Sequence, residues 1–451
     1  MLKGTGAVRG DEARAQSAVL LTTINLACGA IGAVQGLTVA RLLGASAFGV
    51  VAIVTALTAV ATNVVDVRLQ DLVSKLYFDR AATDDVTGAA YKASALRFGL
   101  FLYLACAAAI AVLAAALLFV VAPHLSSAVL LSSWCWMAAA AQALSYLGSF
   151  CIFVQRFVIA PARMAVVQLT SAVVNAVAMV SAVAMLTGIG GYTAGLAASA
   201  LAILIVNGCV TVSAFRAAGV SPFGAHARIA IDRRVVWRFV AAGNILGYVK
   251  LLHRSADVLL VAYFCADRET GIYKLARSMT DVLYAVSEAI GRVYQPHLLL
   301  LLQTGKDGEY RNLARSIGIT GTVVTALALV GVVVGVPHVG SVLHWAALPG
   351  LTLCTAIMTL PFFFVAALQT WIWPAFISFG RMERCMLWST IAVLGGQYLV
   401  GPVLTLVTGT ANPAWFALGY LSYYLLSVLP LWRDLHRMRP SLTGTTGLVA
   451  A

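Results

Sequence analysis

The feature that most constrains this chain is a series of twelve apolar runs, each close to or above the length of a membrane span. A helix needs about 20 apolar residues to cross the hydrocarbon core of a bilayer. The first run is too long for the apolar region of a signal peptide, so we expect it to be kept as a signal anchor. The predicted spans are residues 17–40, 49–66, 96–122, 128–154, 165–187, 191–213, 237–264, 271–297, 316–336, 345–370, 386–408 and 412–432.

The composition agrees with a membrane protein. Hydrophobic residues make up 61% of the 451 residues and charged residues 10%, whereas a soluble domain is about half apolar and about a quarter charged. Too few charges are present to cover a soluble particle of this size. This excludes a soluble enzyme, a secreted disulfide scaffold and a disordered chain. The eight cysteines form no C-x-x-C pair, so we expect small buried side chains rather than disulfides or a metal site.

The distribution of positive charge predicts the topology. The formal net charge is +13, but no basic stripe with aromatics and no nucleic-acid recognition motif is present, which argues against a nucleic-acid partner. Lys and Arg instead gather in one alternate set of loops, and the opposite set holds only Arg41 and Arg268 outright. Basic loops stay in the cytoplasm. We therefore expect both termini to be cytoplasmic.

The spans divide into two sets of six, separated by a basic loop at residues 214–236. An even number of helices in each half makes the halves parallel repeats, an arrangement found in transporters. We expect an all-α polytopic membrane protein of twelve transmembrane helices, arranged as two six-helix bundles around a central cavity. The bundles would comprise residues 17–213 and 237–432, with cytoplasmic tails at 1–16 and 433–451.

Corresponding turns of the two halves resemble each other. The first turn reads RLLGASAFG and ends at Gly49, and the turn after the seventh span reads FCADRETG and ends at Gly271. In both turns a glycine precedes the apolar residue that restarts the helix. Glycine is common in such turns, so the similarity supports the repeat only weakly by itself.

These segments also carry a resemblance to a known family. ARLLGASAFG at 40–49 and ADVLLVAYFCADRETGIYKLAR at 256–277 resemble the Wzx-type polysaccharide and O-antigen flippases of the multidrug/oligosaccharidyl-lipid/polysaccharide exporter (MOP) superfamily. Gln295-Pro296 and Gly380-Arg381 fall where that family tends to carry similar residues. The resemblance implies a substrate, an undecaprenyl-pyrophosphate-linked glycan, and a location in the bacterial inner membrane. It also implies contact with membrane lipids and with the polymerase and chain-length regulator of a polysaccharide pathway.

Ionisable residues within the membrane gather in the seventh and eighth spans, where their cost makes them functional candidates. Four of them follow one face of the seventh span at i, i+3, i+4 and i+7. The candidates are Lys250, His253, Arg254 and Asp257 in the seventh span, and Lys274, Arg277, Asp281, Glu288 and Arg292 in the eighth.

Equal depth in an antiparallel hairpin pairs Asp257 with Arg277 and Arg254 with Asp281. The basic groups outnumber the carboxylates, so the cavity would be cationic. One interpretation is that these charges only hold two helices together. The other is that an anionic headgroup binds to them, since Arg matches phosphate in a bidentate manner and Lys supplies a point charge. Substrate binding would involve the residues Lys250, Arg254, Lys274, Arg277 and Arg292, and ion pairing or cation coupling the residues His253, Asp257, Asp281 and Glu288.

The function predicted from these features and the resemblance is flipping of the lipid-linked oligosaccharide repeat unit by alternating access. An ion-coupled multidrug or small-solute antiporter of the same superfamily is the alternative, and an intramembrane glycosyltransferase is a more distant one. No P-loop and no metal motif is present, so no enzyme activity, cofactor or metal is expected. We expect aromatic residues near span ends to form an interfacial belt, among them Tyr423, Tyr424 and Trp432.

Overall fold

The structure is a computed structural model. It describes residues 5–442 apart from 67–68, 79–85, 127–133, 160, 218–247, 249–250, 282–297, 299, 302–303, 305, 343–348, 363, 365–371 and 379–380.

The chain divides into two compact units. Unit 1 comprises residues Met1–Leu43 and Val50–Leu259, and unit 2 comprises Gly44–Gly49 and Leu260–Ala451. The short stretch Gly44–Gly49 therefore packs with the C-terminal part of the chain, although unit 1 precedes and follows it in sequence. The predicted basic linker lies almost wholly outside the described residues, so the predicted domain boundaries stay a prediction.

The first helix, α1 (Thr5–Val65), is two helices joined at a kink. Its 61 residues include Gly44 with φ 77° and ψ 166°, a backbone conformation that is essentially restricted to glycine. A straight helix of that length would extend about 90 Å, three times the hydrocarbon thickness. The kink at Gly44 therefore separates the first two predicted spans.

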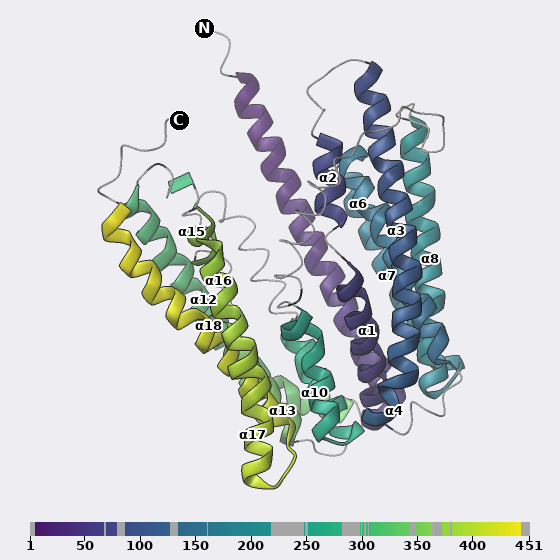
Figure 1. The fold of residues 1–451 in the computed structure, drawn as a ribbon, viewed down its shortest axis with the longest axis vertical. Coiled ribbons are helices and arrows are strands. Elements are labelled where there is room, and N and C mark those ends of the chain that lie inside the picture. Colours follow the sequence, from purple (N-terminus) through teal and green to yellow (C-terminus); the bar gives the residue numbers. More distant parts are fainter. Residues whose placement is uncertain are drawn as a thin grey trace. The chain divides into compact units, whose positions relative to one another are not determined.

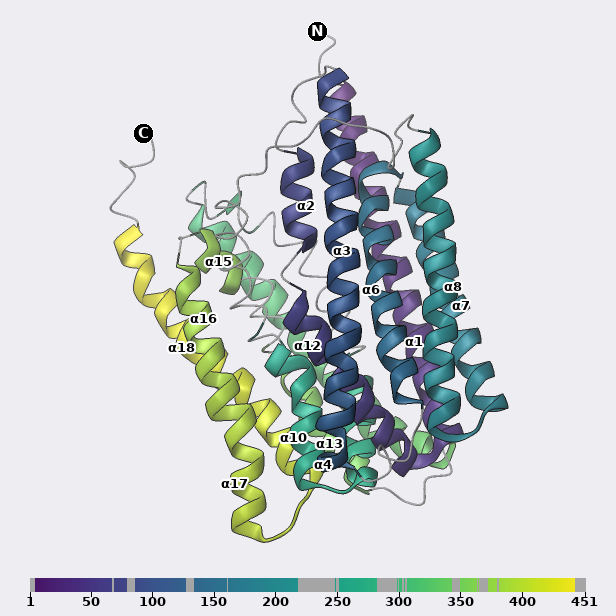
Figure 2. The same cartoon turned by 45° about the vertical axis from the view of Figure 1, so that its right-hand side comes forward.

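Unit 1 continues with a set of long helices that lie side by side (Figure 1 and Figure 2). Helix α6 packs against α3 and α8, and α7 packs against α8. Helices α3 and α8 are apolar around their whole circumference, whereas α2 and α6 have one more apolar side, as in amphipathic helices. The helices are α2 (Leu69–Phe78), α3 (Val86–Val120), α4 (Ala122–Leu125), α6 (Cys135–Val158), α7 (Pro161–Met185) and α8 (Gly188–Ala217).

The core of unit 1 lies where α2 and α6 meet α3. The ring of Tyr103 stacks on that of Tyr146 at 4.9 Å and contacts Phe150. A Cβ on Gly99 would lie 2.9 Å from a methyl of Val73, so the glycine lets α2 approach α3 closely. Small residues allow such packing between membrane helices.

Unit 1 ends in a π-helical turn, η1 (Leu252–Ala256), which leads into α10 (Asp257–Phe264). The chain passes into unit 2 within α10, and a further helix covers residues 267–281. Unit 2 then contains α12 (Asp307–Val342), α13 (Pro349–Thr359), α15 (Trp373–Ser378), α16 (Met382–Ile391), η3 (Ala392–Gln397), α17 (Tyr398–Thr408) and α18 (Pro413–Leu442).

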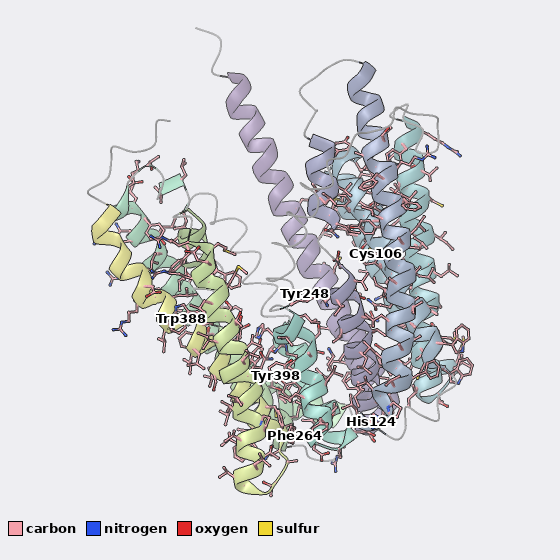
Figure 3. All side chains as sticks on the ribbon, in the orientation of Figure 1. Cys106, His124, Tyr248, Phe264, Trp388 and Tyr398 are labelled. Atoms are coloured by element: carbon pink, nitrogen blue, oxygen red, sulfur yellow. The ribbon has the colours of Figure 1, made fainter. Side chains whose placement is uncertain are left out.

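Helix α18 is the centre of packing in unit 2, where it contacts α13, α16, η3 and α17. Glycines bring the backbones together: a Cβ on Gly396 would lie 2.9 Å from the amide nitrogen of Tyr423, and one on Gly419 would lie 2.9 Å from the carbonyl oxygen of Gln397. Near the far end of α18, Asp434 accepts hydrogen bonds from Arg384 at 3.0 Å and from Trp388 at 3.4 Å. Figure 3 labels Trp388 on α16.

The described residues include eight helices long and apolar enough to cross a membrane. One of them, Ala27–Val65, overlaps both of the first two predicted spans, 17–40 and 49–66, and the others correspond to seven further predictions. The predicted span 345–370 is represented by the shorter apolar helix Gly350–Thr359. The spans 237–264 and 271–297 fall partly outside the described residues, so the arrangement in two bundles of six stays a prediction.

The cysteines are all free, as expected. Cys135, Cys354 and Cys385 are buried. The expectation of burial is wrong for Cys209, which is exposed on α8. Its thiol is small and weakly polar, so the apolar exterior of a membrane helix accommodates it.

Candidate functional site

The predicted site residues differ in how far the structure describes them. His253 and Asp257 in unit 1 and Arg277 in unit 2 are buried, whereas Asp281 is exposed and Lys274 is half-buried. Lys250, Glu288 and Arg292 lie outside the described residues, and of Arg254 only the backbone is described. Every one of these assignments to a substrate or coupling role therefore stays a prediction.

In unit 1 the charged segment coincides with a break in regular helix. His253 and Arg254 lie in the π-helical turn η1, and Asp257 follows it directly. The carboxylate of Asp257 accepts a hydrogen bond from the backbone N–H of Val258 at 3.0 Å. Single π-helical turns occur frequently at functional sites because they change the register of side chains along a helix. The prediction of a regular helix is therefore wrong for Leu252–Ala256, and so is the depth calculated for these residues at 1.5 Å per residue.

In unit 2 the central group is the guanidinium of Arg277. Its Cζ atom lies 4.0 Å from the ring centroid of Tyr420, in cation–π contact. Its Nε atom lies 3.5 Å from Oδ1 of Asp281, four residues further along the same helix. The arginine side chain is 5% exposed and the aspartate 56%, so the charge of Arg277 is inside the unit while that of Asp281 is at its surface.

The depth rule placed Asp281 opposite Arg254 and Arg277 opposite Asp257. The observed contact of Asp281 is within its own helix, at the i, i+4 spacing that favours such pairs. The i, i+4 spacing of Arg277 and Asp281 is visible in the sequence and indicates this pair. Asp257 and Arg277 lie in different units, and the pair predicted between them stays a prediction.

Three tyrosines of α18 form a cluster, and one of them, Tyr420, contacts Arg277. Tyr420 is 0% exposed, and Tyr423 and Tyr424 are also buried. The hydroxyls of Tyr420 and Tyr424 lie 3.3 Å apart, within hydrogen-bonding distance, and the Tyr424 ring is edge-on to both other rings. The expected interfacial belt is therefore wrong for Tyr423 and Tyr424. Trp432, at the end of the predicted span 412–432, is exposed, and its place in the belt stays a prediction.

The tyrosines are buried because α18 is central in its unit. It is packed closely on η3 through Gly396 and Gly419, and Tyr420, Tyr423 and Tyr424 are all buried in this part of the helix. Tyr420 and Tyr424 are four residues apart and lie near the middle of the predicted span 412–432. That position was the available signal, since interfacial aromatics are found at span ends.

Unit 1 holds its polar side chains in a hydrogen-bonded network. The side-chain amide of Gln155 donates to Oδ1 of Asn207 at 3.2 Å and to Thr211 at 3.3 Å, and Asn207 donates to Ser171 at 3.1 Å. A second pair joins the two helices α7 and α1, where Asn175 donates to Gln35 at 3.0 Å. These groups are neutral and hydrogen-bond to one another across helices.

The buried network therefore links α6, α7 and α8, and it carries no net charge. Among the described residues, no group of three or more His, Cys, Asp and Glu side chains could hold a metal ion. The buried cation of Arg277 beside hydroxyl-bearing rings is the arrangement best suited to an anionic or sugar-bearing ligand.

Comparisons with known proteins agree with a transporter. A sequence profile of the family described as polysaccharide biosynthesis protein matches residues 38–343. A search of curated protein sequences finds no match.

Among solved structures, an inward-facing multidrug resistance MATE family transporter of the MOP superfamily superposes with a TM-score of 0.74 at 10% identity. The match covers 95% of this chain and 100% of that one. The lipid II flippase MurJ in an inward closed conformation gives a TM-score of 0.67 at 11% identity, and the match covers 93% of this chain and 87% of that one. A MOP superfamily transporter from Pyrococcus furiosus gives 0.59 at 10% identity, covering 94% and 96%.

At these identities the solved structures establish the fold, and the profile establishes the family because it matches more than half of the chain. The family and the structural neighbours are transporters and flippases rather than enzymes. The resemblance found in the turns at Gly49 and Gly271 is thereby confirmed. The chain is a multi-pass, all-helical membrane protein that belongs to the polysaccharide biosynthesis protein family and has the fold of the MOP superfamily transporters.

Proposed function

We propose that this protein flips an undecaprenyl-pyrophosphate-linked oligosaccharide repeat unit from the cytoplasmic to the outer leaflet of the bacterial inner membrane, for surface polysaccharide synthesis. The physical task is to carry a hydrophilic glycan and a pyrophosphate through hydrocarbon while the polyprenyl tail stays in lipid. An alternating-access pathway lined by polar and cationic groups performs this task.

The observation that carries the proposal is the buried guanidinium of Arg277, held 4.0 Å from the Tyr420 ring. A guanidinium can stack on an aromatic ring with its flat face and bind phosphate oxygens through the N–H groups at its edge. The neighbouring hydroxyls of Tyr420 and Tyr424 add groups that can hydrogen-bond to sugar. Lys250, Arg254, Lys274 and Arg292 are proposed as further ligands of the anionic headgroup.

The family supports the same substrate class. The profile that matches the chain describes polysaccharide biosynthesis, and one of the similar folds is that of a lipid II flippase. An inside-negative membrane potential would favour outward movement of an anionic headgroup, by about 2.3 kcal/mol per charge per 100 mV. The polymerase and chain-length regulator of the pathway are proposed partners on this basis.

The alternative is an ion-coupled multidrug or small-solute antiporter, because the MATE transporter fold is also similar. A cavity for cationic drugs requires carboxylates. In unit 2 the buried charge beside the tyrosines is a guanidinium, and the nearby Asp281 carboxylate is more than half exposed. This distribution favours an anionic substrate.

The first experiment measures the sidedness of lipid-linked glycan in cells depleted of the protein. The proposal expects the glycan to accumulate on the cytoplasmic leaflet, with loss of surface polysaccharide. Normal outer-leaflet glycan in a strain without a redundant flippase would overturn the proposal and favour the antiporter. Efflux of a cationic dye by the same strains tests that alternative directly.

A matched pair of variants connects the activity to the site. Arg277→Gln removes the buried guanidinium, and Arg268→Gln removes an exposed one from the same helix. A charged hydrogen bond contributes about 1.5–3 kcal/mol, so Arg277→Gln should lower the flipping rate at least about tenfold. Arg268→Gln should have little effect. Equal rates for both variants, at equal membrane levels, would remove Arg277 from the proposed site.

A further inference from the structure

Helix α12 presents an unusual surface outside the proposed transport site. Its inner side packs in the core of unit 2 through Tyr310 and Ile317. On its outer side one ridge that begins with two arginines runs at four-residue steps along the helix, and all of its members are exposed. The ridge consists of Arg311, Arg315, Ile319, Val323 and Leu327.

The two arginines of the ridge are not used within the protein as far as the structure describes it. Among the described residues neither Arg311 nor Arg315 forms an ion pair or a hydrogen bond through its side chain, whereas the nearby Lys306 pairs with Glu309 at 3.0 Å. Two adjacent guanidinium groups repel each other by the like-charge rule for i, i+4 positions. An external anion between them would relieve this repulsion.

The apolar part of the ridge has the length of one lipid leaflet. Ile319, Val323 and Leu327 are 58%, 52% and 67% exposed. From Arg315 to Leu327 the helix rises about 18 Å, and half of the hydrocarbon core is about 15 Å thick. A charge at the headgroup level followed by an apolar strip of this length matches a two-chain phospholipid.

We propose that the ridge binds an anionic phospholipid, with the phosphate between Arg311 and Arg315 and one acyl chain along Ile319, Val323 and Leu327. The argument for this occupant is charge complementarity together with the length of the apolar strip. The ridge is an open helix face rather than an enclosed site, so it suits a lipid that remains in its leaflet. The proposal is independent of the transported substrate.

The test compares lipid retention by purified full-length variants with native mass spectrometry. The probes are phosphatidylglycerol and phosphatidylcholine with identical acyl chains. The site variant is Arg311→Gln/Arg315→Gln. The control is Arg163→Gln/Arg216→Gln, which removes two exposed arginines from α7 and α8 of unit 1 and lowers the net charge by the same amount.

Each basic residue at the membrane surface contributes roughly a fivefold affinity for anionic lipid, so the site variant should bind phosphatidylglycerol about 30-fold more weakly. The control should stay near the wild type, and phosphatidylcholine binding should change little in either. Equal losses in both variants would show that net charge alone attracts the lipid. No loss in the site variant would also overturn the proposal.

The acyl-chain position has its own readout. A Val323→Trp reporter in nanodiscs should be quenched more by a trace of phosphatidylglycerol with brominated chains than by brominated phosphatidylcholine. The difference should vanish when Arg311→Gln/Arg315→Gln is added. Equal quenching by both lipids in the arginine-containing protein would contradict the assignment of the chain to this ridge.

Discussion

Gly49 and Gly271 contact each other reciprocally through their backbones: a Cβ atom on either one would lie 3.1 Å from the amide nitrogen of the other. A Cβ on Gly49 would also overlap the carbonyl oxygen of Asp267, and one on Gly271 would overlap that of Ala45. These are the two glycines that end the similar turns of the predicted repeats. The resemblance between the turns therefore has a structural counterpart, since both are brought together within unit 2.

Alanine at either glycine should destabilise the protein. The added methyl has only backbone to displace, and overpacking of this kind costs about 1–3 kcal/mol. Gly49→Ala and Gly271→Ala should each lower the thermal unfolding midpoint in detergent, measured by intrinsic fluorescence. Gly318→Ala on α12 is the control, because a Cβ there would meet nothing within 4 Å. If all three variants unfold at the same temperature, the contact is not tight in solution.

The transport rate should depend on the aromatic ring of Tyr420, which contacts Arg277, and not on the tyrosine hydroxyl. Tyr420→Leu removes a cation–π interaction that contributes about 0.5–2 kcal/mol, so transport should fall several-fold. Tyr420→Phe keeps the ring and should retain most of the transport rate. The measurement is export of surface polysaccharide at matched membrane levels of protein. A Phe variant as impaired as the Leu variant would assign the effect to the hydroxyl contact with Tyr424.

Cys265, in the turn before the helix at 267–281, should be a poor nucleophile. Burial, and secondly the carboxylate of Glu269, raise the pKa of its thiol to about 12. The raised pKa means that thiolate forms only as the pH approaches 12, so at pH 8 its thiolate fraction is on the order of a thousandfold below that of a free cysteine.

Maleimide labelling of a variant with Cys265 as its sole cysteine tests this. The rate should be very slow at pH 8 and still rise about tenfold per pH unit between pH 8 and 10. A sole cysteine at an exposed position in the first turn of the following helix, Arg268→Cys, should react quickly and level off near its ordinary pKa. Similar profiles for both cysteines would show that Cys265 is not buried beside a carboxylate.

The neutral network of unit 1 should contribute to stability. Asn207→Leu would remove one acceptor of the Gln155 amide and the donor to the Ser171 hydroxyl. Hydrogen bonds between membrane helices contribute about 0.6–1.7 kcal/mol each, so the unfolding midpoint should fall by a few degrees. The control is Asn63→Leu, because Asn63 is exposed and donates only to the carbonyl of Ala59 in its own helix. Equal midpoints for the two variants would contradict a stabilising network.

Much of the architecture follows from the sequence because a bilayer imposes a simple rule. Every backbone polar group must be satisfied within its own segment, so apolar runs of sufficient length become helices. The helices α3, α6, α7 and α8 were predictable for this reason. The π-helical turn η1 was not, since a register change in a helix leaves no distinct hydrophobic pattern.

The candidate site was predicted in part. The sequence alone singled out Arg277, because a charge within an apolar run is costly and therefore conspicuous. It could not identify Tyr420, because a tyrosine within a span is unremarkable until a cation is found to lie against its ring. The mid-span position of the α18 tyrosines was a signal for burial, but the close packing of α18 on η3 through Gly396 and Gly419 could not be derived from the sequence.

The sequence by itself thus determined that this chain is a helical membrane protein, and its turns indicated the family. Length and polarity along the chain are local properties, and the bilayer converts them into spans. Only the tertiary structure decided which charges and rings meet, that Gly49 and Gly271 touch, and that Arg311 and Arg315 face outward. These relations join residues far apart in the chain or depend on which face of a helix is buried, and close packing between helices sets them.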